Sequence, residues 1–294
     1  MNDLSFIWLE ITGKCQLRCS HCYAESGPGG NDGVMTPGDW ESVIDQAGRI
    51  GVEMVQFIGG EPTLHRSLPD LVNRALGRGL RVEVFSNLVH VSPRLWELFA
   101  RPGVQLATSY YSDRPDEHEG ITKVRGSHER TKANIVEALR RSIPLRIGVT
   151  DLRDGQRVEQ ARGELAALGF EGEVRVDHLR GVGRGARAMA SDSSALCGQC
   201  GDGKIAVAAD GSVWPCVFSR WLPVGNVRLA PLVEILNGPT MLATTTALAE
   251  RFAQRPVSPC VPNMCDPQCG PSCGPACNPA GNCTPKGKCV PTEY

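Results

Sequence analysis

Residues 5–22 read SFIWLEITGKCQLRCSHC, an apolar run that ends in a loop with three cysteines. The run at residues 5–10 is short and rich in aromatic and branched side chains, as buried parallel strands are. Cys15, Cys19 and Cys22 follow it at C-x3-C-x2-C spacing. Three thiolates at this spacing can ligate three irons of a 4Fe–4S cube, and the fourth iron then lacks a protein ligand. An open coordination position is typical of catalytic metals, whereas an electron-transfer cluster normally takes four cysteines.

Short apolar runs and helical patterns alternate after this loop up to about residue 180. The expected strands span residues 5–10, 54–58, 81–86, 104–110, 145–150 and 173–179. One expected helix starts from an N-cap at Thr36, and the others span residues 68–76, 93–99, 127–139 and 158–168. This alternation predicts an α/β fold with a parallel sheet and helices outside. Six units fall short of the eight of a closed TIM barrel, so we expect a partial (β/α)6 barrel whose mouth lies at the strands' C-terminal ends.

The composition changes near residues 181–191, where a glycine-rich, flexible connector leads into a second region. We expect residues 1–188 to form the barrel and residues 189–294 to form a small, irregular, cysteine-rich domain. A hairpin is expected at residues 204–214, with its turn at Asp210-Gly211, and a helix at residues 241–253.

Several polar residues near the strand ends are weaker candidates for a functional role. On or after the sixth expected strand these are Asp177, His178, Arg180 and Arg184, the last as a partner for a carboxylate. A solvated polar loop is expected after the fourth strand, with Asp113, Asp116, His118 and Glu119.

Cysteine usage and charge limit the class of protein. Three of the thirteen cysteines lie at residues 15–22 and the other ten follow from Cys197 onward, while the formal net charge is -1. That balance argues against binding to nucleic acid or to an anionic membrane surface. Without a long apolar run or a signal-peptide pattern, we expect a cytoplasmic protein. Thiols there stay reduced, which favours metal or iron–sulfur ligation over disulfides, as does the odd cysteine count.

The C-terminal tail follows one rule. Each of its seven cysteines, between residues 260 and 289, is followed two positions later by proline. Proline fixes φ and removes a hydrogen-bond donor, so neither a helix nor a central strand is expected. Apolar residues for a core are almost absent, so order would have to come from metal bonds. The alternative is a disordered tail of low complexity.

The cysteine spacing ahead of alternating βα units resembles the radical S-adenosylmethionine (SAM) superfamily. Gly59-Gly60-Glu61-Pro62 ends the second expected strand, where that superfamily has a Gly-Gly-Glu-Pro segment binding the amino group of SAM. The resemblance implies that the glycines let the backbone approach SAM and that Glu61 pairs with the ammonium. It also implies SAM contacts at the ends of the next two strands, from Ser86, Asn87 and Ser109. The cluster and SAM would then generate a 5′-deoxyadenosyl radical that abstracts hydrogen from the substrate.

The second region resembles the SPASM/twitch extensions of radical SAM enzymes, which carry a C-x9–15-G-x4-C hairpin. Cys197 or Cys200, followed by Gly211 and Cys216, matches this hairpin, whereas the tail cysteines depart from its usual continuation. One or two auxiliary iron–sulfur clusters are therefore expected, with a zinc module or disulfides as alternatives. The candidate ligands are Cys197, Cys200, Cys216, Cys260, Cys265, Cys269, Cys273, Cys277, Cys283 and Cys289.

Together these resemblances imply a radical SAM maturase that crosslinks or epimerises a ribosomally made precursor peptide. A radical SAM dehydrogenase or sulfatase-maturing enzyme, acting on an alcohol or a Cys/Ser side chain, is the alternative enzyme. A non-catalytic iron–sulfur electron carrier is the alternative from another class. The expected partners are a precursor peptide or small-molecule substrate and an electron donor of the flavodoxin or ferredoxin type. Because the cysteine loop begins at Cys15, we expect no winged-helix recognition domain ahead of it. A peptide is then expected to need a separate recognition protein or to dock directly at the barrel mouth.

Overall fold

The computed structural model describes residues 4–187 and 190–253 of the 294-residue chain. One nine-stranded sheet runs through them in the order β6-β5-β4-β3-β2-β1-β7-β8-β9. The strands are β1 (Phe6–Thr12), β2 (Met54–Gly59), β3 (Arg81–Phe85), β4 (Val104–Ser109), β5 (Leu145–Asp151), β6 (Val174–His178), β7 (Lys204–Val207), β8 (Ser212–Trp214) and β9 (Gly225–Asn226). The helices are α1 (Pro37–Arg49), α2 (Leu68–Gly77), α3 (Pro93–Phe99), α4 (Pro115–Thr122), α5 (Ser127–Arg140), α6 (Val158–Ala167), α7 (Leu232–Leu236) and α8 (Pro239–Ala253).

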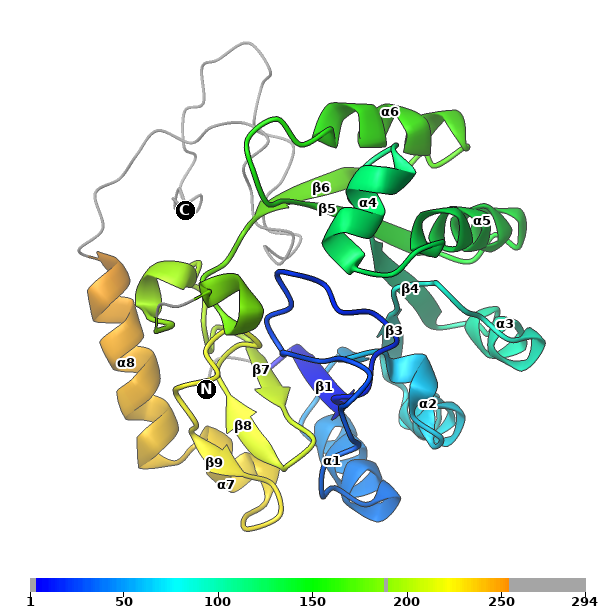
Figure 1. Cartoon of the computed structure of the whole chain (residues 1–294). Helices are drawn as coiled ribbons and strands as arrows, with labels where there is room; N and C mark the ends of the chain where they lie inside the picture. The colour runs from blue at the N-terminus through cyan, green and yellow to red at the C-terminus, as the bar shows by residue number, and fades with distance from the viewer. Residues whose placement is uncertain (1–3, 188–189, 254–294) are drawn as a thin grey trace, which may run out of the picture.

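The first six strands form the expected partial barrel. They pair in parallel with their neighbours from β1 to β6. The sheet curves, and α1, α2, α3, α5 and α6 lie along its outer side (Figure 1). The predicted open α/β barrel is therefore confirmed, and its strand ends gather at one mouth.

Strand β1 lies inside the sheet between β2 and β7, and its two faces pack in two different apolar cores. Ile7 and Leu9 belong to the large apolar cluster that includes Trp40 of α1. Trp8, which points to the other face, packs in a second cluster with Trp214 of β8. Alternation of side chains along a strand explains this division.

Local signals account for the start of α1. The Thr36 hydroxyl accepts from the Asp39 N–H over 3.2 Å, and the Asp39 carboxylate accepts from the Thr36 N–H over 2.8 Å. This capping box contributes about 1 kcal/mol to helix stability. Trp40, Val43, Ile44 and Ala47 then recur at helical spacing and are all buried.

The hairpin of the second region belongs to the same sheet as the barrel. The expected β7–β8 hairpin forms, and β7 pairs in parallel with β1, placing Lys204 opposite Phe6. The sheet thus crosses the boundary expected near residue 188. The glycine-rich connector contains a short 3₁₀ turn, η2 (Gly183–Ala186), where we expected only a flexible link.

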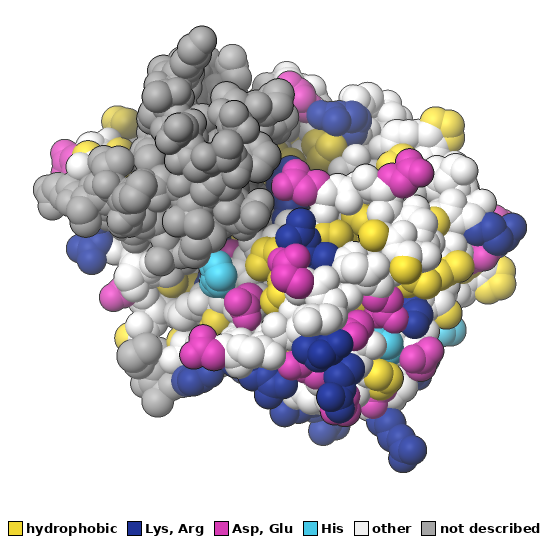
Figure 2. All heavy atoms as spheres, turned by 90° about the horizontal axis from the view of Figure 1, so that it is seen from above, with side chains coloured by type: hydrophobic (Ala, Val, Ile, Leu, Met, Phe, Trp, Pro, Cys, Tyr) yellow, Lys and Arg dark blue, Asp and Glu magenta, His cyan; other side chains and the backbone are white. Residues whose placement is uncertain are grey.

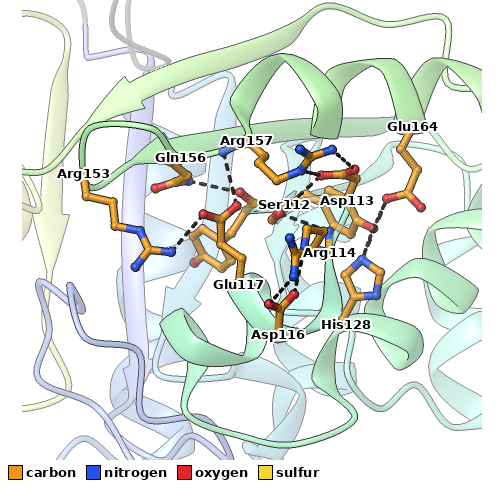
Figure 3. A network of polar contacts seen from close by, with 12 residues as sticks. Ser112, Asp113, Arg114, Asp116, Glu117, His128, Arg153, Gln156, Arg157 and Glu164 are labelled. Carbon is orange, nitrogen blue, oxygen red and sulfur yellow. Dashed lines mark hydrogen bonds and ion pairs between the residues drawn. The ribbon is translucent and has the colours of Figure 1, made fainter.

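The segment after β4 is helix α4, where we expected a solvated loop from Asp113, Asp116, His118 and Glu119. The helix buries His118, which is 1% exposed. Arg157 pairs with Asp113 at 2.7 Å and Arg153 pairs with Glu117 at 2.9 Å, which ties α4 to the start of α6 (Figure 3). These partners lie far apart in sequence, so the local pattern alone missed the helix.

No helix in the described ranges combines the length and the apolar character that a bilayer crossing requires.

Candidate functional site

The three-cysteine loop lies at the carboxyl end of β1, and backbone hydrogen bonds close it at its base. The Cys15 N–H donates to the Gly27 carbonyl over 3.1 Å, and the Gly27 N–H donates to the Gly13 carbonyl over 3.3 Å. A Cβ at Gly30 would lie 1.9 Å from the Gly13 carbonyl oxygen, so only glycine fits there. Backbone hydrogen bonds and close packing of the chain therefore hold the base of the loop.

Helix α4 holds the outer side of the loop. The Arg18 N–H donates to the Thr122 carbonyl and the Ser20 N–H donates to the Ile121 carbonyl, each over 3.0 Å. Both carbonyls belong to the last turn of α4. The helix that sequence patterns missed is thus a support for the loop between Cys15 and Cys22.

The loop thiols suit an iron–sulfur cluster. Burial, with a smaller effect of the neighbouring thiols, raises the pKa of Cys15 and of Cys19 to about 12. A bound metal reverses this, because coordination deprotonates thiols. The Leu17 N–H and the Asn87 amide already donate to the Cys15 sulfur, over 3.4 and 3.7 Å. In the described part of the chain, no three side chains of His, Cys, Asp or Glu lie close enough together to hold a single metal ion. The thiolates that ligate a 4Fe–4S cube lie farther apart than the ligands of one ion, so this finding does not exclude a cluster.

Gly59 and Gly60 bring the end of β2 against the start of the loop. The Gly60 N–H donates to the Thr12 carbonyl over 2.7 Å. A Cβ at Gly59 would lie 2.3 Å from the Thr12 carbonyl oxygen, and one at Gly60 would lie 2.1 Å from that of Lys14. Both glycines line the main cavity. Their backbone is therefore within reach of a ligand there.

Glu61 is fully buried beside the loop, and Pro62 begins the 3₁₀ turn η1 (Pro62–Leu64). The Glu61 carboxylate accepts from the Thr63 N–H over 3.1 Å, the Thr63 hydroxyl over 2.8 Å and the Asn87 N–H over 2.8 Å. Burial raises the pKa of Glu61 in spite of these bonds. The carboxylate thus joins the ends of β2 and β3, and its contact with SAM stays a prediction.

The predicted residues at the ends of β3 and β4 take two different positions. Asn87 and Ser109 line the cavity. The Asn87 side-chain oxygen accepts from the Gln16 amide over 3.0 Å. Ser86 is 1% exposed, and its hydroxyl accepts from the Leu88 N–H over 3.1 Å. The structure therefore brings Asn87 and Ser109 together with the cysteines and buries Ser86 in the turn behind them.

The main cavity occupies the barrel interior and has a volume of about 600 Å³. All three loop cysteines line it, together with apolar side chains such as Trp8 and Phe85. Its lining includes six Arg and Lys residues and three Asp and Glu residues, whereas basic and acidic side chains are interspersed on the outer face shown in Figure 2. The basic interior suits an anionic group, such as a cluster with three thiolates.

A buried carboxylate, that of Glu83, holds three polar side chains of the cavity wall in place. Glu83 is 2% exposed and accepts from Arg146 over 2.7 and 3.1 Å, from Gln105 over 2.7 Å and from Gln56. Burial alone would raise the pKa of Glu83, but Arg146 and the two amides outweigh it and lower that pKa. Four strands contribute to this network, and no local sequence signal indicates it.

A second cysteine group lies next to the β7–β8 hairpin. Cys200 and Cys216 are buried, and the pKa of the Cys200 thiol is raised by its hydrogen bond to Cys216, by burial and by nearby Cys197. Gly211 makes the turn with φ +86°, and a Cβ there would lie 2.5 Å from the Asn226 side-chain oxygen. The structure brings these three predicted ligands together. The other seven lie outside the described residues: Cys260, Cys265, Cys269, Cys273, Cys277, Cys283 and Cys289.

Two contacts that the sequence did not indicate tie β1 and the end of the cysteine loop to the segment that follows Cys216. The Arg220 guanidinium donates to both oxygens of the Glu10 carboxylate over 2.7 Å and lies 4.5 Å from the Trp214 ring. Tyr23, directly after Cys22, packs edge-on against Phe218 with ring centroids 5.1 Å apart.

The polar candidates on β6 also line the cavity. Asp177 pairs with Arg180 at 3.2 Å, and the Arg180 guanidinium lies 4.8 Å from the Phe218 ring. His178 lies 3.9 Å from the Asp151 carboxylate. Each of these side chains has a protein partner, and a contact with substrate stays a prediction.

Comparisons with known proteins agree with this arrangement. Residues 9–160 match the model of the radical SAM superfamily, and residues 197–273 match that of an iron–sulfur cluster-binding domain, SPASM. A structure of Streptococcus suis SuiB bound to S-adenosylmethionine has a TM-score of 0.65 at 16% identity, covering 82% of this chain and 67% of that one.

Two curated relatives show how far sequence similarity extends. The AdoMet-dependent heme synthase of Methanosarcina barkeri is 27% identical over 166 residues, which are 55% of this chain and 48% of the relative. The PqqA peptide cyclase of Xanthomonas campestris is 29% identical over 192 residues, which are 63% of this chain and 50% of the relative. The chain spans about half the length of these relatives.

Proposed function

Because the chain belongs to the radical SAM superfamily, we propose that it modifies a ribosomally made precursor peptide by radical chemistry. When bound, the 4Fe–4S cluster and SAM supply a carbon-centred radical that abstracts hydrogen from an unactivated carbon. The observation that carries the proposal is the shared cavity, which is lined by Cys15, Cys19 and Cys22 and by side chains of the barrel strands. The thiolates would hold the cluster at the same cavity that receives the substrate.

Different residues around the cavity would bind the cluster, orient SAM and exclude water. The loop cysteines would hold the cluster, while the backbone at Gly59 and Gly60 and the Asn87 side chain would orient SAM beside it. Trp8 and Phe85 also line the space, and apolar walls of this kind exclude the water that would quench a reactive intermediate.

The size of the cavity favours a substrate of which only one or two side chains enter the barrel. A volume of about 600 Å³ lies within the range of small-molecule sites. SAM and one or two side chains of a peptide fit such a space, so the rest of a precursor would lie outside the mouth. Relatives with this kind of substrate support the proposal: one is named a PqqA peptide cyclase, and SuiB has been solved with its precursor peptide SuiA.

The second cysteine group supports a maturase with auxiliary clusters. Cys197, Cys200 and Cys216 lie together beside the hairpin, and the matching SPASM model extends over them. We propose that they hold an auxiliary iron–sulfur cluster, completed by tail cysteines. Such a cluster can accept the electron released when a substrate radical is oxidised to product.

Co-expression tests the substrate class. Each short reading frame next to this gene is co-expressed with the full chain, and the peptide is analysed by tandem mass spectrometry. A crosslink appears as loss of the mass of the hydrogens removed, and epimerisation as altered stereochemistry at unchanged mass. The Cys19→Ala variant is the matched control and should leave every peptide unmodified. If no peptide changes while an alcohol or a sulfatase peptide is oxidised, the dehydrogenase or sulfatase-maturing alternative is correct.

A further inference from the structure

The connector after β6 lies directly against the three-cysteine loop. The Arg184 guanidinium donates through Nε to the Cys19 carbonyl and through Nη2 to the Ser26 carbonyl, each over 2.8 Å. The Arg184 backbone N–H donates to the Cys22 carbonyl over 3.1 Å. One residue of the connector thus makes three hydrogen bonds along the loop, two of them to cysteine ligands.

A glycine makes this approach possible. Gly183 has φ +55°, and a Cβ there would lie 2.3 Å from the Tyr23 carbonyl oxygen and 2.7 Å from that of Cys22. No other residue fits at that distance. The backbones of the connector and the loop are therefore in direct contact at Gly183. The Arg184 side chain extends from this contact along the loop.

Among the residues that the structure describes, the protein partners of Arg184 include no carboxylate, so its expected contact with one stays a prediction for a bound ligand. All three acceptors are backbone carbonyls. Within the described ranges no carboxylate pairs with Arg184. Carbonyls hold the guanidinium in place without cancelling its charge, so a full positive charge stays beside the ligand loop. The planar fork of arginine suits two acceptors at fixed spacing, which a lysine ammonium does not match.

We propose that Arg184 is a positioning residue that shapes the ligand loop and makes the cluster bound there easier to reduce. The cluster gains one negative charge when an external reductant gives it an electron, and a nearby fixed cation stabilises the more negative state. Arg184 is half-buried, so salt screens its charge less than it would at a fully exposed site. This inference rests on the family's cofactor and not on the identity of the substrate.

The test is a redox titration of the reconstituted full chain, followed by electron paramagnetic resonance. The loop cluster is identified as the signal that added SAM perturbs. Arg184→Gln removes the charge, Arg184→Lys keeps it, and Arg187→Gln removes an exposed charge three residues away as the matched control. Arg184→Gln should lower the ratio of reduced to oxidised cluster roughly tenfold at a fixed potential, which corresponds to a midpoint about 59 mV more negative.

The variants separate charge from shape. Arg184→Lys should hold less iron in the loop than wild type but keep a midpoint close to it, and Arg187→Gln should match wild type in both. If Arg184→Gln cannot assemble the loop cluster, the proposal requires that Arg184→Lys assembles it with a near wild-type midpoint. The proposal is overturned if Arg184→Gln equals Arg187→Gln in iron content and midpoint. It is also overturned if the midpoint of Arg184→Lys is shifted as far as that of Arg184→Gln.

Discussion

The molecule presents two groups of cysteines that differ in what surrounds them. Cys15, Cys19 and Cys22 line the main cavity. Cys200 and Cys216 pack in an apolar cluster with Trp8 and Trp214 and do not contribute to the cavity lining described here. The same ligand chemistry is thus placed once where a small molecule can reach it and once behind the hairpin. We therefore expect access to the cavity, together with an open iron position, to distinguish a reactive cluster in the loop from an auxiliary cluster in the second group.

The two groups are also supported in different ways. The loop is held by backbone hydrogen bonds from α4, from the Gly27 turn and from the connector at Arg184. The second group is held by strand pairing at β7–β8 and by apolar packing. Substitutions should therefore affect the two groups separately.

The largest expected effect follows from removing a loop ligand. Cys15→Ala, Cys19→Ala or Cys22→Ala should each abolish SAM cleavage, because a cube with two protein ligands should not persist. The iron of the second region should remain, since strand pairing at β7–β8 and apolar packing hold that group. Iron analysis and quantified 5′-deoxyadenosine check this, and undiminished 5′-deoxyadenosine from any of the three variants would contradict it.

The next largest effect is expected from removing a ligand of the second cysteine group. Cys200→Ser should remove about four irons per chain, the content of one cube, and leave SAM binding intact. Equilibrium binding of SAM and iron analysis of the same sample measure both. If zinc occupies the second region when both metals are supplied, or if Cys200→Ser loses SAM binding together with its iron, the division between the two groups is wrong.

The ion pair that joins the two regions should matter for stability. Arg220→Met leaves Glu10, whose side chain is 6% exposed, buried without its partner. Breaking such a pair costs about 3 kcal/mol, whereas replacing both members by apolar residues is close to neutral. Arg220→Met should therefore lower the melting temperature, and Glu10→Met combined with Arg220→Met should restore much of it. If the double variant melts at no higher temperature than Arg220→Met, loss of the ion pair is not the cause of the lower melting temperature.

The smallest expected change concerns SAM affinity. Glu61→Gln should weaken SAM binding about tenfold to a hundredfold, since a charge-assisted hydrogen bond is worth roughly 1.5–3 kcal/mol. Iron content should stay at the wild-type level. Glu53→Gln at the other end of the cavity is the matched control. Unchanged SAM affinity with loss of iron would assign Glu61 only the role seen in its bonds to Thr63 and Asn87.

Local patterns predicted most of the barrel. The apolar runs that became β2 to β5 and the capping signals at Thr36 are properties of short segments. The cysteine spacing identified the loop in the same way. What the sequence did not indicate depends on contacts between distant segments: α4 is stabilised by Arg153 and Arg157, and β7 pairs with β1 across about two hundred positions.

The same distinction holds at the site. Gly59 and Gly60 belong to a recognisable segment, but their need for glycine comes from the carbonyls of Thr12, at the end of β1, and of Lys14, in the loop after it. Arg184 was expected to meet a carboxylate, and only the fold shows that it contacts loop carbonyls. Cysteine ligation in the tail stays a prediction, because those positions lie outside the described residues.

The most direct test of the central claim is reductive cleavage of SAM by the purified protein. The full chain is reconstituted anaerobically with iron and sulfide, supplied with SAM and dithionite, and assayed for 5′-deoxyadenosine by liquid chromatography and mass spectrometry. The account predicts 5′-deoxyadenosine from the wild-type protein and none from Cys19→Ala. A reconstituted protein that carries its clusters and forms no 5′-deoxyadenosine under any substrate condition would contradict the account and favour an iron–sulfur electron carrier.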